Sequence, residues 1–338
     1  MPRTGPLVVV LGASGYIGSA VVAELARRPV RLRLVARRAG TLPPGGGAWI
    51  ERCPADVSAP GALARAVAGA DVVIHLVAHK AGGAVSWRAA EGDALAERLN
   101  AGLMREVVAA LRAQGRPAGR PPVVLFAGSA SQVGRPGRID GSEPDEPVTV
   151  YARQKLDAER ALMAATAEGV VRGISLRLPT VYGRGPGPHG GGVVAAMALR
   201  ALAGEPLTVW NNGAVERDLV HVRDVARAFS ACLDHADALA GKHWLVGTGR
   251  AVRVADLFHA VAASVSARTG LAPVPVIPVE PPATATAADA RGTVVDSSAF
   301  HSVTGWRPRL PLREALDELV AALAVGERGA QRTRTSGT

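Results

Sequence analysis

The chain opens with a strand-like apolar run that enters a glycine-rich turn and then a helical pattern. Residues 6–26 read PLVVVLGASGYIGSAVVAELA and place Gly12, Gly15 and Gly18 in a GxxGxxG turn. Glycines let a backbone turn sharply and approach a pyrophosphate, whose negative charge is favoured by the N-terminus of the following helix. A second strand pattern, RLRLVARR, follows about 20 residues later. The arrangement predicts the βαβ unit of a dinucleotide-binding Rossmann domain.

The end of the second strand indicates which dinucleotide is bound. NAD enzymes usually carry an acidic residue there, which binds the ribose 2′-hydroxyl. Arg37 and Arg38 stand at that place in this chain, and two guanidinium groups suit a 2′-phosphate. We therefore expect NADP(H). Asp56 and Val57 follow a third apolar segment and are expected at the adenine, and the fourth segment, residues 71–80, is expected beside the nicotinamide ribose.

Length and composition place the chain among α/β proteins. Its 338 residues can hold one large domain or two smaller ones. Strand-like apolar runs alternate with Ala-rich helical stretches, which predicts a doubly wound parallel sheet. No apolar run reaches membrane-spanning length, so we expect a cytoplasmic protein without a membrane partner. Cys53 and Cys232 provide neither a disulfide framework nor metal-ligand spacing, and no metal is expected.

The net charge of +10 raises the question of a nucleic-acid partner. The basic residues are scattered along the chain, aromatic residues make up 4% of it, and no nucleic-acid-binding motif occurs. We therefore expect no nucleic-acid partner. Anionic small ligands account for part of the positive charge.

The segment YARQK places Tyr151 and Lys155 four residues apart, on one face of a helix. An ammonium beside a phenol favours the ionised or hydrogen-bonded phenol, which suits proton transfer at a carbonyl or carbinol. The chain has only three lysines and three tyrosines. By itself this spacing is commonly an ordinary solvated helix face, but the glycine-rich turn upstream favours a catalytic interpretation.

Five motifs occur along the chain, and with these motifs in this order the chain resembles the extended short-chain dehydrogenase/reductases. They are GASGYIG, VVLFAGSAS (123–131), YARQK, RLPTVYGRG (177–185) and RDLVHVRDVARAF (217–229), followed by GWRPRLPLREAL (305–316). The resemblance covers nearly the whole chain. It implies a Rossmann-type α/β fold with a smaller C-terminal lobe for a nucleotide sugar.

The resemblance also implies the roles of individual residues. Ser129 orients the substrate oxygen, with Ser131 as the alternative, Tyr151 is the acid, and Lys155 also holds the nicotinamide ribose. Expected cofactor contacts are Gly12, Ser14, Gly15, Tyr16, Ile17, Gly18, Arg37, Arg38, Asp56, Val57, Leu76, Val77, Ala78, Lys80, Asn100, Lys155, Pro179 and Val181. Asn100 matches a helix asparagine that supports the proton relay. Expected substrate contacts are Ser129, Ser131, Gln132, Tyr151, Arg217 and Arg291. The two arginines match arginines of the family that reach the diphosphate of a sugar nucleotide.

Departures from the family pattern narrow the implied reaction. The 4,6-dehydratases carry an Asp-Glu pair where this chain has Ala130 and Ser131, so elimination of water lacks its acid and base. The GDP-fucose synthase-like members use a Cys-His pair, and neither cysteine lies near that motif. UDP-galactose 4-epimerases retain NAD and usually keep the acid that Arg37 and Arg38 replace. Reduction with exchangeable NADPH remains.

Within the family, FAGSASQVGR, PDEPVTVYARQKLDAERAL and RGISLRLPTVYG look most like the NADPH-dependent 4-ketoreductases of dTDP-4-keto-6-deoxyhexoses. Those enzymes serve deoxysugar pathways of natural products, so the implied small-molecule partner is a dTDP-linked sugar. Two alternatives stay open, a nucleotide-sugar 4-epimerase with bound NAD and an NADP-sensing protein without turnover. A homodimer is compatible with the sequence but is not dictated by it.

The sequence also suggests how the lobes are divided. Residues 1–178 with about 213–247 are expected to form the NADP-binding domain, about 179–212 and 248–328 the sugar-nucleotide lobe, and 329–338 a flexible tail. The segment GRGPGPHGGG (183–192) is too rich in Gly and Pro for a regular element. It is a candidate loop over the substrate or a passive linker.

Overall fold

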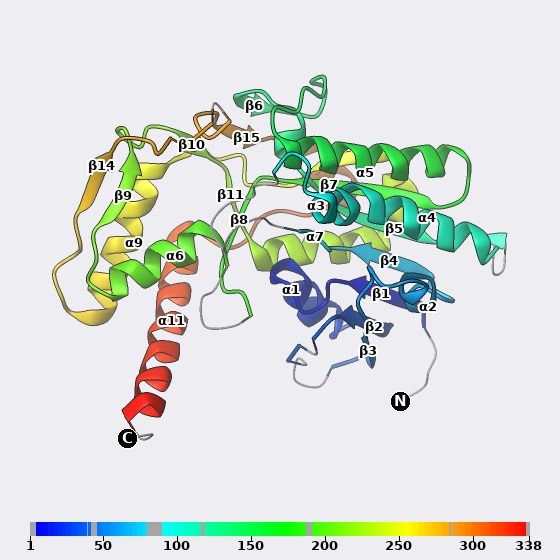
Figure 1. The fold of residues 1–338 in the computed structure, drawn as a ribbon, viewed down its shortest axis with the longest axis horizontal. Coiled ribbons are helices and arrows are strands. Elements are labelled where there is room, and N and C mark those ends of the chain that lie inside the picture. The colour runs from blue at the N-terminus through cyan, green and yellow to red at the C-terminus, as the bar shows by residue number, and fades with distance from the viewer. Residues whose placement is uncertain are drawn as a thin grey trace.

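A central sheet of seven parallel strands organises the protein (Figure 1). The computed structural model describes residues 5–38, 40–41, 46–79, 90–115, 119–186, 191–283, 285–286 and 288–335, with side chains to Val325. The strand order is β12-β7-β5-β4-β1-β2-β3. The strands are β1 Leu7–Leu11, β2 Arg31–Ala36, β3 Trp49–Pro54, β4 Val72–His75, β5 Val123–Ser129, β7 Arg172–Leu178 and β12 Lys242–Leu245.

The order reverses beside β1, which pairs with β2 on one side and β4 on the other. Ligands of such sheets bind at this switch point, beyond the carboxyl ends of the strands. All five residues of β1 are buried, as expected for a strand that is covered on both faces. The predicted doubly wound α/β fold is confirmed.

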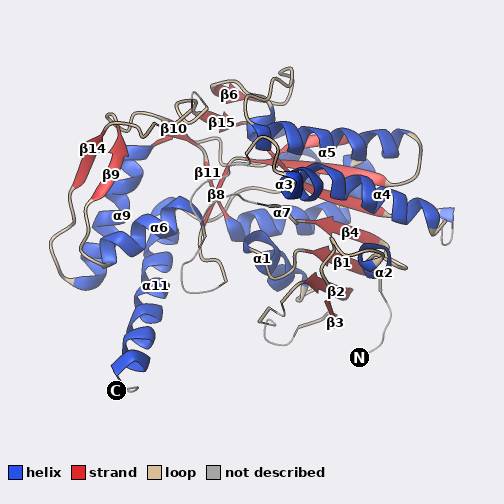
Figure 2. Cartoon of the chain, viewed as in Figure 1, coloured by secondary structure: helices blue, strands red, loops and turns tan. Residues whose placement is uncertain are grey.

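Helices cover both faces of the sheet (Figure 2). On one face α1 (Tyr16–Leu25) and α7 (Val222–Asp234) pack on residues such as Val8, Val10 and Ile74. On the other face lie α2 (Ala62–Ala66), α4 (Leu103–Ala113) and α5 (Val150–Ala167). Successive side chains of a strand point to opposite faces, so each strand contributes to both cores. Three shorter elements also lie between strands β4 and β7 in the chain. They are α3 Ala94–Glu97, the π-helix η1 Arg98–Gly102 and the 3₁₀-helix η3 Ala130–Gln132.

Two glycines of the first turn are required by close backbone approach. Gly12 has φ +84°, and a Cβ there would lie 3.2 Å from the backbone of Leu76 and Val77. A Cβ at Gly18 would lie 2.1 Å from the Gly12 carbonyl oxygen, which only glycine avoids. The turn is therefore packed against β4 and α1 at the switch point.

A second lobe lies at the left of Figure 1 and has an apolar core of its own. It is built from α6 (Gly192–Leu202), α9 (Val254–Thr269) and α11 (Leu312–Thr335), with β9 (Leu207–Trp210) paired to β14 (Val276–Val279). The remaining elements are β6 Gly137–Ile139, β8 Thr180–Tyr182, β10 Glu216–Arg217, β11 Leu219–His221, α8 Ala236–Leu239, β13 Val252–Arg253, β15 Thr293–Val295 and α10 Ser298–Thr304. The residue boundaries given above for the two lobes stay a prediction.

The end of the chain differs from its expected form. Helix α11 continues through Thr335, where the sequence predicted a flexible tail from residue 329. Ala330, Gln331, Arg332 and Arg334 in this stretch are good helix formers, and they extend a helix whose first turns are packed. Residues 336–338 lie outside the described part of the chain.

Candidate active site

A cavity of about 290 Å³ lies at the carboxyl ends of β4, β5 and β7. Its walls include Leu76 and Ala78 after β4, Ser129 at the end of β5, and Leu178 at the end of β7. Residues of β10 and of the segment that leads into β15 complete the lining. The cavity therefore stands at the switch point, where the fold places ligands.

Tyr151 and Lys155 reach this cavity together from the first turns of α5. Thr149 caps the helix, and its hydroxyl oxygen accepts from the Ala152 N–H at 3.1 Å. Thr149 also lines the cavity, although it was not among the residues expected at the site. A threonine directly before a helix is a common N-cap, and that signal in VTVYA could have identified it.

Lys155 is almost fully buried, at 3% exposure. Its Nζ donates to the Ala127 carbonyl at 2.9 Å and lies 4.5 Å from the centre of the Phe126 ring and 5.9 Å from that of Tyr151. Burial lowers the pKa of Lys155 to about 7. Burial also raises the pKa of the Tyr151 phenol, so Tyr151 carries its proton throughout the neutral range.

Ser129 ends β5 and forms part of the cavity wall. Its Oγ lies 2.7 Å from the Ser131 Oγ, and the Ser129 N–H donates to the Gln132 Oε1 at 2.7 Å. Gln132 was predicted to contact the substrate, but it is fully buried beneath Ser129 and does not line the cavity. The capping box of η3 turns the Gln132 side chain back toward the backbone of Ser129. Its role in the structure is to hold the Ser129 backbone.

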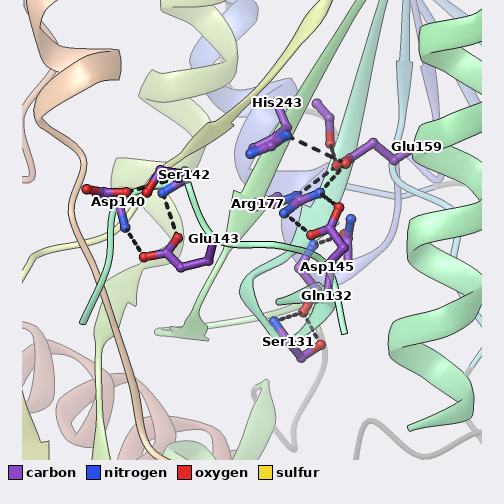
Figure 3. A network of polar contacts seen from close by, with 12 residues as sticks. Ser131, Gln132, Asp140, Ser142, Glu143, Asp145, Glu159, Arg177 and His243 are labelled. Atoms are coloured by element: carbon purple, nitrogen blue, oxygen red, sulfur yellow. Dashed lines mark hydrogen bonds and ion pairs between the residues drawn. The ribbon is translucent and has the colours of Figure 1, made fainter. Parts of the chain in front are cut away.

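A buried ionic network lies close to the segment Ser129–Gln132, called the serine loop below (Figure 3). Arg177, 1% exposed on β7, donates to both carboxylate oxygens of Asp145 at 2.6 and 2.9 Å and to Glu159 of α5. Glu159 also accepts from the Ser175 hydroxyl at 2.6 Å. These bonds fix the loop before α5 against β7. Nothing in the short motif YARQK indicates the partners, because they come from three separate segments.

Two arginines, one on β10 and one just before β15, line the same cavity. Arg217 donates to the Asp289 carbonyl at 2.7 Å and to the Arg291 carbonyl, and Arg291 donates to the Gly134 carbonyl at 2.5 Å. Burial lowers the pKa of Arg217, an effect that outweighs the opposing influence of the Asp289 carboxylate. Arg217 on β10 and Arg291 in the segment before β15 thus line the same cavity as Tyr151 and Ser129.

Charge in the lining is one-sided. The described residues around the cavity include the cations Lys155, Arg217 and Arg291, and they include no Asp, Glu, Cys or His. Hydroxyl groups come from Ser129, Ser131, Thr149, Tyr151, Thr180 and Thr293. Such a lining favours an anionic, hydroxyl-rich ligand and provides a phenol as its proton donor.

The residues expected at the cofactor surround the first turn. Ile17, Leu76, Ala78, Pro179 and Val181 line the catalytic cavity. Gly15 is the N-cap of α1 without a side-chain cap, so the first N–H groups of the helix remain available to a pyrophosphate. The residues around the turn therefore fit a dinucleotide. Ser14 and Arg38 line a second cavity, and Lys80 lies outside the described residues.

Other expected contacts have roles within the protein. Asn100, 2% exposed in η1, accepts from the His79 N–H at 2.7 Å and donates to the His79 carbonyl and to Gln154 Oε1. It thereby fixes the chain that leaves β4. The Tyr16 hydroxyl donates to the Gly183 carbonyl at 3.2 Å. Asp56 accepts from Ser58, and this bonding lowers the pKa of the Asp56 carboxyl. Val57 and Val77 pack in the core on the α2 face.

Residues 8–247 match the model of the NAD dependent epimerase/dehydratase family. The chain belongs to this family. It is 30% identical over 95% of its length to dTDP-6-deoxy-L-talose 4-dehydrogenase (NAD(P)(+)) from Kitasatospora kifunensis, with 97% of that relative covered. It is 31% identical over 61% of its length to UDP-glucose 4-epimerase from Mycolicibacterium smegmatis (strain ATCC 700084 / mc(2)155), with 63% of that protein covered.

Among solved structures, MoeE5 in complex with UDP-glucose and NAD superimposes with a TM-score of 0.76 at 28% identity, covering 97% of this chain and 100% of that one. The resemblance to extended short-chain dehydrogenase/reductases is confirmed. The family is one of NAD(P)-dependent enzymes that oxidise, reduce or epimerise nucleotide sugars.

Among the described residues, no group of three or more His, Cys, Asp and Glu side chains is placed to hold a metal ion. Within the same part of the chain, no helix combines the length and apolar character needed to cross a membrane.

Proposed function

We propose that the protein reduces the C4 ketone of a dTDP-4-keto-6-deoxyhexose with NADPH, in a pathway of deoxysugar biosynthesis. One observation carries the proposal. Ser129, Tyr151 and Lys155 share one cavity with two arginines, and the described lining holds no carboxylate, cysteine or histidine. The site therefore contains a proton donor for one oxygen but no second acid or base for elimination or for epimerisation at C3 or C5.

The side chains divide the work of a carbonyl reduction. When bound, NADPH supplies the hydride. Tyr151 donates its phenolic proton to the alkoxide that forms on the sugar, and Ser129 donates a hydrogen bond to the same oxygen as its charge develops. Lys155, as a cation, stabilises the phenolate that Tyr151 becomes and holds the nicotinamide ribose.

In this proposal the arginines on the far side of the cavity bind the nucleotide diphosphate of the substrate, which stays attached to the sugar throughout the reaction. Arg217 and Arg291 are the expected partners of the diphosphate, because guanidinium groups bind phosphate oxygens through paired hydrogen bonds. Their backbone-carbonyl bonds fix the direction of each side chain. The described lining of the cavity holds no carboxylate that would repel a diphosphate.

The relative from Kitasatospora kifunensis supports reduction at C4, because its name describes oxidoreduction at C4 of a dTDP-deoxysugar. The match spans almost the whole length of both chains. A second candidate is a nucleotide-sugar 4-epimerase with bound NAD. The UDP-glucose 4-epimerase from M. smegmatis and the MoeE5 complex favour it. The same tyrosine chemistry serves both reactions, so the cofactor and its exchange decide between them.

The proposal is tested by incubating the purified protein with NADPH and a panel of dTDP- and UDP-4-keto sugars, with the C4 product identified by NMR. Stoichiometric NADPH oxidation and a C4 alcohol are expected with a dTDP-4-keto-6-deoxyhexose. Tightly bound NAD after purification, with interconversion of C4 epimers and no net NADPH oxidation, would instead establish the epimerase. NADPH binding without turnover on any sugar of the panel would favour an NADP-sensing protein.

A further inference from the structure

Arg37 and Arg38 are neighbours in the sequence but belong to opposite faces of the sheet. Along β2, Val35 packs in the core on the α2 face, whereas Leu34 packs in the core on the α1 face. Leu34, Ala36 and Arg38 follow each other at intervals of two residues and line one cavity, as the alternation of side chains along a strand predicts. Arg37 acts electrostatically on Asp56, together with Arg98, whereas Arg38 lines a cavity on the α1 face.

That cavity has a volume of about 830 Å³ and begins beside the glycine-rich turn, at Ser14. Leu34, Ala36 and Arg38 from β2 line it, and so do Arg52 and Pro54 from β3. The parallel register pairs Leu34 with Arg52 and Ala36 with Pro54. Arg38 and Arg52 therefore stand on the same face of two adjacent strands.

The charge of this cavity is strongly positive. Arg38, Arg52, Arg184 and Arg223 line it, and the only carboxylate among its described lining residues is Glu318, which is ion-paired with Arg223. Arg38 and Arg52 are exposed, and neither forms a hydrogen bond or ion pair with a described residue. Two cations at the mouth of one cavity are thus available to an anion that enters beside Ser14.

We propose that Arg38 and Arg52 together bind the 2′-phosphate of NADP(H) beside Ser14, and that Arg37 instead lies on the adenine side with Asp56. Arg52 is then a specificity-determining residue that comes from β3 and not from the end of β2. This inference rests on the proposed NADPH dependence and adds to it the residues that produce the preference.

The test measures binding of 2′,5′-ADP and of 5′-AMP to the full-length protein by calorimetry, because these probes differ only in the 2′-phosphate. NADPH and NADH are titrated in parallel. The variants are Arg37→Ala, Arg38→Ala and Arg52→Ala, with Arg27→Ala as the exposed control at the end of α1, whose side chain is 79% exposed. Thermal melting checks that each variant is folded.

Arg38→Ala should lower the preference for 2′,5′-ADP over 5′-AMP by about tenfold or more, since a charge-assisted contact is lost. Arg52→Ala should lower it by roughly threefold or more, because Arg52 stands farther from the strand end and acts partly through screened attraction. Arg52→Lys should retain most of the preference, because it keeps the charge. Arg37→Ala and Arg27→Ala should keep the preference within about twofold.

The outcomes separate this inference from the function on which it rests. A wild-type protein that binds neither NADPH nor NADH would overturn the proposed function. Equal wild-type affinity for 2′,5′-ADP and 5′-AMP would overturn the NADPH preference. A clear wild-type preference that is lost in Arg37→Ala and unchanged in Arg52→Ala would overturn the inference alone.

Discussion

Arg177 and Asp145 form a bidentate ion pair, with nitrogen–oxygen distances of 2.6 and 2.9 Å, that joins β7 to the loop in front of α5. Arg177 is 1% exposed, and Glu159 on α5 binds the same guanidinium (Figure 3). Tyr151 lies between Asp145 and Glu159 in the sequence, at the start of α5, which Asp145 precedes and to which Glu159 belongs. The ion pair therefore sets the position from which Tyr151 reaches the cavity.

Replacing Asp145 should disturb both stability and catalysis. Asp145→Asn leaves the buried Arg177 with only Glu159 as a charged partner, and we expect a loss of about 1 to 3 kcal/mol in the free energy of unfolding. We also expect kcat to fall more than the affinity for NADPH, because the start of α5 shifts. Urea unfolding and steady-state kinetics measure the two effects. Asp140→Asn, an exposed change in the same loop, is the matched control, and an equal effect there would contradict the role assigned to the ion pair.

Lys155→Met should weaken NADPH binding and turnover while stabilising the protein without cofactor. The pKa of Lys155 falls from 10.5 to about 7 on burial, so the folded state disfavours the charged amine. The wild-type protein therefore loses stability as the pH falls from 10.5 to about 7, by about 1.4 kcal/mol for each step of one in pH. The methionine variant should lack this pH dependence, and thermal melting between pH 7 and pH 10 measures it. Identical slopes for the two proteins would show that Lys155 is not desolvated.

His75 should produce a separate loss of stability in acid. It is 1% exposed at the end of β4, and neither ring nitrogen has a hydrogen-bond partner among the described residues. Burial, followed by the charge of Lys155, lowers the pKa of His75 from 6.5 to about 3. Stability is then fully present above pH 6.5 and is lost as the pH falls toward 3.

In His75→Leu the melting temperature should depend less on pH between pH 6.5 and pH 3 than it does in the wild type, because the leucine cannot be protonated. It should cost little stability at pH 7, since no hydrogen bond is removed. The window lies below that of Lys155, so one pH series separates the two residues. If the melting temperature of His75→Leu falls with pH as steeply as that of the wild type, groups other than His75 cause the loss of stability in acid.

The alternation of strand-like and helical segments was sufficient to predict the parallel sheet. The convergence of Tyr151, Lys155, Ser129 and Arg217 was predicted from the resemblance to the extended short-chain dehydrogenase/reductases, and the four residues line one cavity. Gly12 and Gly18 mark the first turn through backbone approaches that exclude a Cβ. The burial of Gln132 could not be predicted, because a side chain next to a serine loop can turn outward or back to cap it. The separate placement of Arg37 and Arg38 also could not be predicted from the motif, because it depends on the cavity that Arg38 lines and on the proximity of Arg37 to Asp56.

Tyr151→Phe should lower turnover by roughly 100- to 10,000-fold, because it removes the proton donor and little else. NADPH affinity should stay close to that of the wild type. Stopped-flow reduction of a keto sugar and fluorescence titration of NADPH measure the two quantities. Tyr182→Phe is the matched control, because Tyr182 is buried and does not line the catalytic cavity. Near wild-type turnover in Tyr151→Phe would eliminate Tyr151 as the acid.

Arg217→Ala should raise the KM for the nucleotide sugar more than it changes kcat. A diphosphate contact is made equally in the ground state and the transition state, so its loss reduces binding in both. A charge-assisted hydrogen bond amounts to about 1.5 to 3 kcal/mol, or roughly tenfold to a hundredfold in affinity. Salt screens part of the attraction between the guanidinium and the diphosphate. The affinity of the wild type for dTDP should therefore fall as salt is added, and the affinity of the variant should fall less.

Two comparisons make the Arg217 experiment specific. Arg291→Ala should produce a similar rise in KM, since Arg291 lines the same cavity. Arg253→Ala, on the strand β13 that pairs with β10, removes an exposed arginine outside the cavity and should leave KM unchanged. Calorimetry with dTDP and with NADPH separates the two ligands. If Arg217→Ala weakens NADPH while dTDP affinity stays fixed, the arginine serves the cofactor, and the second lobe does not bind the diphosphate as proposed.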